Sequence, residues 1–150
     1  MDKEQDNFLS QPSTSDGMEL LEALDSAGVR RFKVGVFDVD GVFRGKYMSR
    51  AKFASALEKG FGFCDVVLGW DSADELYDSS RIAGWHTGYR DAKVALDPST
   101  ARLLTIEDET ALVIGEFQGD HAEVCPRNLL RRVSEKASSL GFVAHAAAEY

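Results

Sequence analysis

The sequence predicts an α+β domain whose sheet has mixed or antiparallel pairing. Two hairpin signals, one at Asp40-Gly41 and one at residues 107–109, lie along the chain with helical patterns between and around them. A parallel α/β sheet would instead require a regular alternation of strands and helices, which the chain lacks. With 150 residues, of which 44% are hydrophobic, the chain can bury a core and form one domain, or one domain and the start of another.

The N-terminal part predicts a tail followed by a short helix. Residues 1–16 are mostly polar, and we expect them to form a flexible tail. A helix is expected over residues 18–27, with Ser15 or Asp16 as its N-cap and Gly28 at its end.

A hairpin and a second helix are expected next. Residues 31–37 alternate between apolar and polar positions, which indicates a half-buried strand. Asp40-Gly41 favours a type I′ turn, in which both central residues have positive φ, and residues 42–48 form the returning strand. Ser49 can cap a helix that ends near Lys59.

The middle of the chain predicts two short strands separated by a long loop. Residues 63–68 are apolar and β-branched, and residues 93–96 form a second short apolar run. Between them, residues 70–90 are rich in Gly, Ser, Asp, Trp and Tyr and follow no clear period. Loops of this length are usually functional or disordered.

The C-terminal part predicts a hairpin, a helix and a final strand. Residues 102–106 and 111–117 flank a polar turn and form the hairpin. A helix begins at Pro126 and ends at Gly141, with an apolar stripe along one face. Residues 142–149 are expected to form a strand that opens a further domain.

Composition excludes several classes of function. The net charge of −8 argues against nucleic acid or an anionic membrane surface as a partner. No apolar run has the roughly 20 residues that a membrane span requires, and no export signal is visible. Cys64 and Cys125 lack the spacing of a zinc site or a disulfide framework, so we expect two small buried side chains in a cytoplasmic protein.

The segment around Asp38 and Asp40 resembles the motif of haloacid-dehalogenase-type phosphatases. In that family the first Asp attacks phosphorus and the second protonates the leaving group, with Mg²⁺ bound between them. A turn after a strand also favours Asp and Gly for backbone reasons. The expected downstream elements, a strand ending in Ser or Thr and a late acidic pair after a buried strand, are missing. The context therefore disfavours a phosphatase.

A second resemblance extends over residues 29–150. The segments that carry it are Asp38-x-x-Gly41-x-x-Arg44-Gly45-Lys46, Gly60-Phe61-Gly62-Phe63, Gly69-Trp70-Asp71, Leu96-Asp97-Pro98-Ser99-Thr100, Pro126-Arg127-x-x-Leu130 and Ala148-Glu149-Tyr150. In this order they resemble the N-terminal β-grasp domain of the glutamine synthetase family, followed by the beginning of its first metal-binding strand. The Arg-Gly-Lys and Gly-Trp-Asp segments are more similar to the amine-ligating or uncharacterised relatives.

The resemblance implies an ATP-dependent ligase with Mg²⁺ or Mn²⁺. It would join the γ-carboxylate of glutamate to ammonia or an amine through γ-glutamyl phosphate. The N-terminal domain would complete the active site of a neighbouring subunit in a ring of six or twelve. The expected division is a tail over residues 1–16, a β-grasp domain over 17–125, and the start of a truncated catalytic domain over 126–150. A free-standing β-grasp interaction module is the non-enzyme alternative.

The resemblance also suggests three site residues. A carboxylate is needed to attract ammonium or an amine and to accept its proton, and Asp71 and Asp78 both match the family's loop aspartate. Glu149 resembles the first carboxylate of the metal-binding strand, since hard divalent ions prefer oxygen ligands. The alternative for each Asp is a solvated loop residue or an Asx-turn, and for Glu149 a frayed terminal residue.

Overall fold

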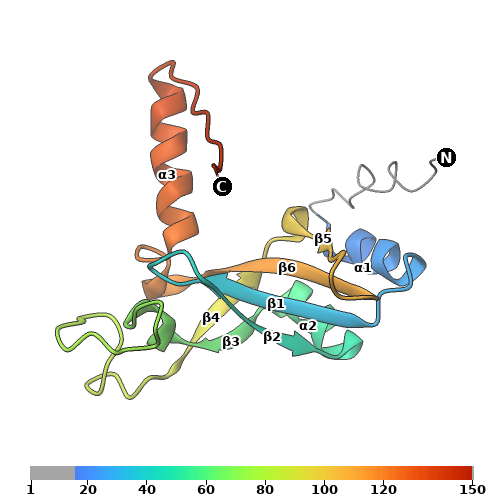
Figure 1. The fold of residues 1–150 in the computed structure, drawn as a ribbon, viewed down its shortest axis with the longest axis horizontal. Coiled ribbons are helices and arrows are strands. Elements are labelled where there is room, and N and C mark those ends of the chain that lie inside the picture. Colours follow the sequence, from blue (N-terminus) through green and yellow to red (C-terminus); the bar gives the residue numbers. More distant parts are fainter. Residues whose placement is uncertain (1–15, 150) are drawn as a thin grey trace.

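The computed structural model describes residues 16–149. The tail predicted over residues 1–16 therefore lies outside the described residues, apart from Asp16. The described chain forms a mixed sheet with helices on it, as the sequence predicts (Figure 1). No described helix is long and apolar enough to cross a membrane.

The sheet has the strand order β2-β1-β6-β4-β3, with the short β5 also paired to β6. Among the strands of residues 16–149, only β1 and β6 run parallel, and every other pair is antiparallel. The mixed pairing predicted from the sequence is thus confirmed. The strands are β1 (Arg31–Phe37), β2 (Phe43–Met48), β3 (Phe61–Cys64), β4 (Asp91–Leu96), β5 (Arg102–Leu103) and β6 (Thr110–Phe117).

Helices α1 (Gly17–Ser26) and α2 (Arg50–Lys59) pack on the sheet and share its larger core cluster. Both begin as predicted, because the side chain of Asp16 accepts hydrogen bonds from the first turn of α1 and Ser49 does so for α2. Phe32 of β1 stacks on Phe53 of α2 with ring centroids 4.5 Å apart. The buried members of this cluster are Leu20, Leu21, Leu24, Val29, Phe32, Val34, Met48, Phe53, Ala56, Leu96, Ala101, Ala111 and Val113.

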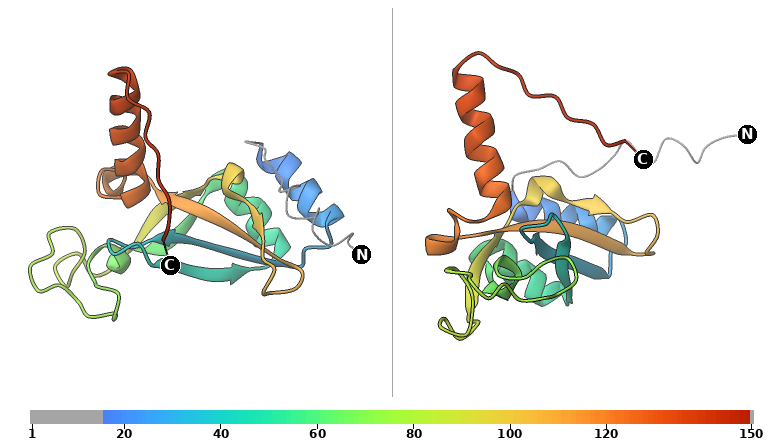
Figure 2. Two further views of the ribbon diagram at one scale, coloured as in Figure 1. Left: turned by 45° about the horizontal axis from the view of Figure 1, so that its top comes forward. Right: turned by 60° about the vertical axis from the view of Figure 1, so that its left-hand side comes forward.

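A second core cluster lies where residues 70–90 and α3 (Pro126–Ser139) leave the sheet. It contains Leu68, just before the loop, and Cys125, just before α3. The loop and α3 extend from the same end of the sheet, away from α1 (Figures 1 and 2). The predicted irregular loop is confirmed, since it holds only one isolated bridge, between Trp70 and Leu76.

The turn between β1 and β2 differs from the predicted type I′ turn. Of its two central residues only Gly41 has a positive φ, of 80°. The connection is longer, because the Asp38 N–H donates to the carbonyl of Val42 and the Gly41 N–H donates to that of Asp38. The side chain of Asp38 also accepts bonds within the turn, which a two-residue loop would not allow.

Three predicted strands are wrong in whole or in part, one of them the strand over residues 102–106, of which only Arg102–Leu103 forms β5. β3 ends at Cys64, and Asp65–Leu68 forms a 3-10 turn. The reason is that β4 begins at Asp91, which pairs with Cys64, so residues beyond Cys64 have no strand partner. Residues 142–149 form no strand, since no strand within residues 16–149 pairs with them.

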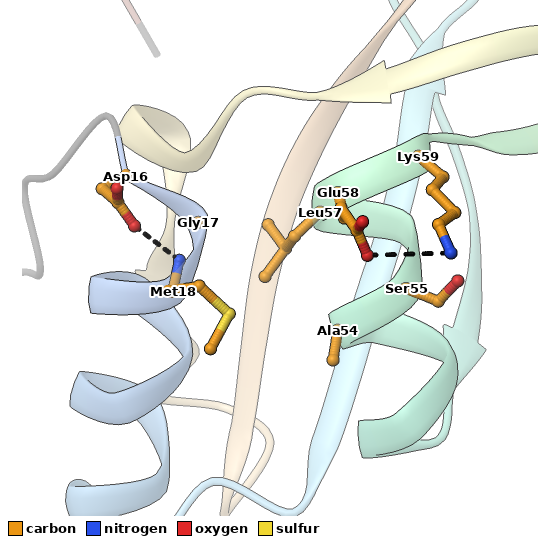
Figure 3. A pocket seen from close by; sticks show the side chains of 8 residues that line it. All are labelled: Asp16, Gly17, Met18, Ala54, Ser55, Leu57, Glu58 and Lys59. Carbon is orange, nitrogen blue, oxygen red and sulfur yellow. Dashed lines mark hydrogen bonds and ion pairs between the residues drawn. The ribbon is translucent and has the colours of Figure 1, made fainter.

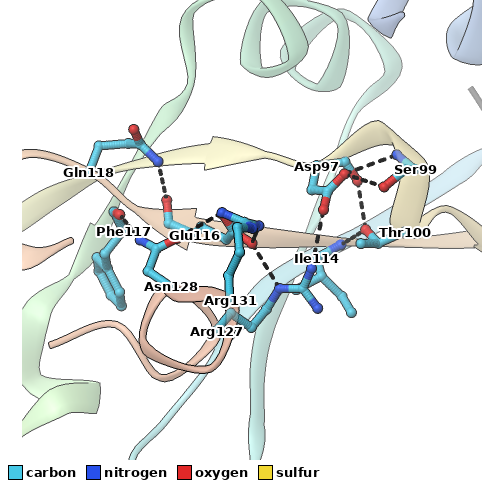
Figure 4. Close-up of polar contacts among 10 residues, drawn as sticks. All are labelled: Asp97, Ser99, Thr100, Ile114, Glu116, Phe117, Gln118, Arg127, Asn128 and Arg131. Carbon is cyan, nitrogen blue, oxygen red and sulfur yellow. Dashed lines mark hydrogen bonds and ion pairs between the residues drawn. The ribbon is translucent and has the colours of Figure 1, made fainter. Parts of the chain in front are cut away.

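The amphipathic helix predicted from Pro126 is confirmed as α3, but its apolar face is exposed. No residue of α3 is buried, and it projects from the sheet as a single helix (Figure 1). Its first half is held to the sheet by polar contacts (Figure 4). The exposed apolar residues of α3 and of the segment after it are Leu129, Leu130, Val133, Leu140, Phe142 and Val143.

Candidate functional site

The hairpin motif places Asp38 in the interior, with no exposed surface. Its Oδ1 accepts the N–H groups of Asp40 (3.0 Å) and Val42 (2.8 Å), and its Oδ2 accepts the Nε–H of Arg44 at 2.7 Å. Both oxygens are therefore committed to protein donors. Asp38 has no free face for attack on phosphorus, and the strand before it belongs to a mixed sheet, so the phosphatase alternative is not supported.

Arg44 connects this buried carboxylate to the long loop. Its Nη1 donates to Asp74 Oδ1 (2.5 Å) and its Nη2 donates to the carbonyl of Asp71 (3.1 Å). The guanidinium also lies 5.0 Å from the centre of the Trp70 ring. The hydrogen bond to Asp38 is the largest cause that raises the pKa of Arg44.

Asp71 shapes the first half of the loop. Its Oδ1 accepts the N–H groups of Ala73 (2.8 Å) and Glu75 (3.0 Å), and the Asp71 N–H donates to the carbonyl of Glu75. The hairpin adds another contact, because Asp40 Oδ2 accepts the N–H of Ser72 at 2.8 Å. The Asx-turn considered from the sequence is thus present at Asp71.

Asp78 lies in a different setting. It lines a shallow hollow of about 320 Å³, and its side chain is exposed. Within residues 16–149 the structure gives its carboxylate no hydrogen-bond or ion-pair partner. The other residues that line the hollow are Leu76, Tyr77, Ser80, Gly84, Trp85, His86 and Tyr89.

The hydroxyl of Tyr77, next to Asp78 in the chain, is influenced by three carboxylates of the hairpin and the loop. Desolvation raises the pKa of the Tyr77 hydroxyl, and the charges of Asp40, Asp71 and Asp38 raise it further. A negative potential that disfavours a phenolate also favours a cation. Within residues 16–149, neither oxygen of Asp78 has a protein partner, whereas Oδ1 of Asp71 accepts two backbone N–H groups and its Oδ2 accepts none.

The second half of the loop is organised by its own residues. Ser80 Oγ accepts the N–H groups of Ile82 and Ala83, both at 3.3 Å. Trp85 and Tyr89 meet edge to face with centroids 5.3 Å apart, and Trp85 is 85% exposed. An exposed tryptophan of this kind is suited to a contact with another chain or with a ligand.

The described residues do not form a metal site. Glu149 is exposed and lies in the segment without regular structure after α3. Across residues 16–149, no group of three His, Cys, Asp or Glu side chains is arranged to hold a metal ion. Glu149 is a single carboxylate, so no chemistry of ATP or Mg²⁺ can be assigned to these residues.

A larger hollow between α1 and α2 offers little chemistry. It has a volume of about 560 Å³ (Figure 3). Among its polar residues, Asp16 caps α1, and Glu58 pairs with Lys59 at 3.8 Å. Neither interaction leaves a group aimed at a ligand.

Sequence reasoning missed two polar centres. The hairpin motif contains Arg44, but nothing in the sequence connected it with the Asp38 side chain or the loop. The second centre is His121, whose Nε2 lies 3.4 Å from Oδ2 of Asp65, which is fully buried. The available signal was the spacing in Asp38-x-x-Gly41-x-x-Arg44, which brings the acid and the arginine to the same end of a hairpin.

Comparison with known proteins identifies the relatives of this chain. It is 42% identical to type-1 glutamine synthetase 2 of Dictyostelium discoideum over 107 residues, which are 69% of this chain and 20% of that protein. It is 32% identical to glutamate–isopropylamine ligase of a Pseudomonas species over 146 residues (95% and 32%). It is 30% identical to a gamma-glutamylethanolamide synthetase of Streptomyces coelicolor over 138 residues (89% and 30%).

The chain belongs to the glutamine synthetase family. It matches the N-terminal portion of these glutamine synthetase-type proteins and spans at most 32% of their length. No family model matches it. The family resemblance predicted from the sequence is therefore confirmed.

Solved structures of the family share the fold. GmaS in complex with ADP superposes with a TM-score of 0.62 at 19% identity, over 85% of this chain and 26% of that chain. The glutamine synthetase of Plasmodium falciparum gives 0.63 at 18% identity, over 89% and 24%. These matches confirm the predicted α+β class, and the model is consistent with the N-terminal β-grasp domain of glutamine synthetase.

Proposed function

We propose that this chain is the N-terminal domain of a glutamine synthetase-type ligase that joins the γ-carboxylate of glutamate to ammonia or an amine, with ATP as the energy source. The observation that carries the proposal is the relationship to two amine-ligating proteins over 95% and 89% of this chain. A γ-glutamyl phosphate would form first, and nitrogen would then displace the phosphate.

Within this reaction, the proposed role of residues 70–90 is to complete the active site of a neighbouring subunit in a homo-oligomeric ring. The loop extends from the end of the sheet and exposes Trp85, Tyr77 and Asp78. The nitrogen of an ammonium ion has no lone pair, so a carboxylate must attract the cation and accept a proton before attack.

We assign that role to Asp78 in preference to Asp71. Asp78 lies in the hollow without a protein partner, whereas one oxygen of Asp71 already accepts two backbone N–H groups. A carboxylate that holds the loop in shape is less available to a cation than one that faces solvent. The alternative assignment to Asp71 is tested by the same experiment.

The ATP and divalent metal of the proposed ligase would bind outside the described residues, in the remainder of a longer protein. Residues 126–150 would begin that catalytic domain, and the exposed apolar face of α3 would pack within it. The proposed location is the cytoplasm, which supplies both glutamate and ATP.

The test is a ligase assay of the full-length protein with glutamate, ATP and a panel of acceptors. The panel holds ammonia, isopropylamine, ethanolamine, a polyamine and an aromatic amine. We expect ATP-dependent formation of a γ-glutamyl amide with at least one of them. No amide with any acceptor, from a folded and ATP-binding protein, would reject the ligase.

The loop assignment is tested in the same assay with Asp71→Asn and Asp78→Asn. The control is Glu75→Gln, an exposed carboxylate in the same loop. We expect Asp78→Asn to lower the rate of nitrogen transfer by about a hundredfold, and the control to keep it. A loss confined to Asp71→Asn would move the role to Asp71.

A further inference from the structure

We propose that Arg44, supported by the buried Asp38, is a positioning residue for the acceptor site and sets the affinity for the amine. This inference rests on the proposed function, because it assigns the loop carboxylates to the nitrogen acceptor. The hairpin motif would then position the loop and would not itself contact a substrate.

Both carboxylate oxygens of the buried Asp38 accept hydrogen bonds. Asp38 has no exposed surface, and its oxygens accept two backbone N–H groups and the Nε–H of Arg44. A buried carboxylate with these partners is fully hydrogen-bonded, which is the condition for keeping a charge in the interior. The Arg44 side chain is only 16% exposed, so its orientation is fixed by this pair.

The planar geometry of the guanidinium then determines which hydrogen bonds the two Nη groups of Arg44 can donate. Because Nε is engaged by Asp38, the two Nη groups face the loop and donate to Asp74 and to the carbonyl of Asp71. The planar fork makes these three bonds together and still stacks on Trp70. Lysine carries a single point charge and cannot reproduce that set.

The contacts on the loop side fall within a short segment just before Asp78. Trp70, Asp71 and Asp74 all contact Arg44, and the N–H of Tyr77 donates to the carbonyl of Gly69 at 2.9 Å. We call the contacts of Arg44 with Trp70, Asp71 and Asp74 the clamp. The clamp therefore determines the position of Asp78, the residue after Tyr77. Because Asp78 is the residue assigned to attract the amine, its displacement should weaken amine binding and leave the binding of ATP and glutamate unchanged.

The experiment uses the full-length protein and two variants of the clamp. Asp74→Asn removes the negative charge of the loop partner and leaves the buried pair intact, and Asn tolerates the positive φ of 66° at this position. Arg44→Lys keeps the charge and loses the fork. The matched control is Arg50→Lys, because Arg50 forms a similar paired contact with Asp25 on α1, away from the loop.

The readout is the KM for amine, ATP and glutamate, together with hydrogen exchange of the amides of residues 72–77. For both clamp variants we expect the amine KM to rise about tenfold, the other two KM values to change less than about twofold, and exchange to accelerate in that segment. The control should leave all of these unchanged.

Equal changes in all three KM values, or an unchanged amine KM with faster exchange, would overturn the positioning role. Unchanged exchange in both variants would overturn the clamp itself. An inactive wild-type protein would reject the proposed ligase and with it the link to the amine. The exchange measurement would then still decide whether Arg44 holds the loop.

Discussion

Two arginine–carboxylate clusters fasten segments to this sheet, and they do so in opposite ways. At the hairpin, Asp38 directly follows β1 and Arg44 belongs to β2, and Arg44 reaches outward to the loop. At the base of α3, Glu116 belongs to the sheet and its partners Arg127 and Arg131 belong to the attached helix (Figure 4). Arg127 also pairs with Asp97 at 3.1 Å.

The two clusters differ in which part of the structure needs the buried carboxylate, Asp38 in one and Glu116 in the other. The Asp38–Arg44 pair remains whole if the loop detaches, because the loop contributes Asp74, which is 59% exposed. The Glu116 cluster exists only while α3 is in place. We therefore expect the first acid to stabilise the whole sheet, and the second to stabilise mainly the attachment of one helix.

The largest expected effect is that of Asp38→Ala on the stability of the fold. It leaves Arg44 without its buried partner and two turn N–H groups without an acceptor. We expect the free energy of unfolding to fall by about 3–5 kcal/mol, measured by urea denaturation. Asp25→Ala is the control, since the Asp25–Arg50 pair is exposed, and an equal loss in both variants would contradict the comparison.

Glu116→Gln should have a smaller and more local effect. Gln keeps the shape of the side chain but removes the charge that binds Arg127 and Arg131. We expect a loss of about 1–3 kcal/mol, together with faster hydrogen exchange in α3 than in β6. Glu123→Gln, on an exposed residue nearby, should change neither quantity. Uniformly faster exchange in helix and sheet would show that Glu116 acts on the whole fold.

Substitution of Asp71 and of Asp78 should change the free energy of unfolding by different amounts, because the two side chains have different contacts. Asp71→Ala removes the acceptor of two N–H groups and should cost about 1 kcal/mol. Asp78→Ala should stay within about 0.5 kcal/mol of the wild type, as expected at an exposed site. Thermal unfolding of the two variants side by side is sufficient. A greater loss for Asp78→Ala would reverse our assignment of structural and functional roles.

The smallest effect concerns a third, partly buried cluster, in which Glu107 contacts Lys33 and Tyr47. The hydrogen bond from Lys33 is the largest cause that lowers the pKa of Glu107 below 4.5, followed by that from Tyr47. A carboxylate whose pKa is lowered by folding stabilises above its unfolded pKa and loses that contribution as the pH falls through the folded one.

The melting temperature of wild type and Glu107→Gln should therefore differ most near neutral pH, and the two curves should approach each other below about pH 4.5. A constant difference between the curves would show that ionisation of Glu107 does not contribute.

Local signals in the sequence were sufficient for the elements that depend on local bonds. Asp16 and Ser49 could be read as helix caps, and the alternation in β1 gave its buried face, because capping and alternation involve neighbouring residues. The type I′ turn failed because the Asp38 side chain supplies bonds that backbone preference alone does not predict.

The rest depended on contacts between distant residues. The sequence offered both Asp71 and Asp78 as the loop aspartate, and only the fold shows that one oxygen of Asp71 is committed to the backbone. Arg44 and Asp74 are 30 positions apart, so no local pattern connects them. The periodicity of α3 gave its apolar stripe correctly, but periodicity shows which residues share a face and not what covers that face.

The most direct test of the account separates the two halves of the proposed reaction in Asp78→Asn and Glu75→Gln full-length proteins. Glutamate-dependent release of ADP without an acceptor reports the phosphoryl step, and γ-glutamyl amide formation reports nitrogen transfer. We predict that Asp78→Asn keeps the first at the wild-type rate and loses about a hundredfold in the second, with no change in the control. Amide formation at the wild-type rate in Asp78→Asn, or an equal loss in both steps, would contradict the role given to this loop.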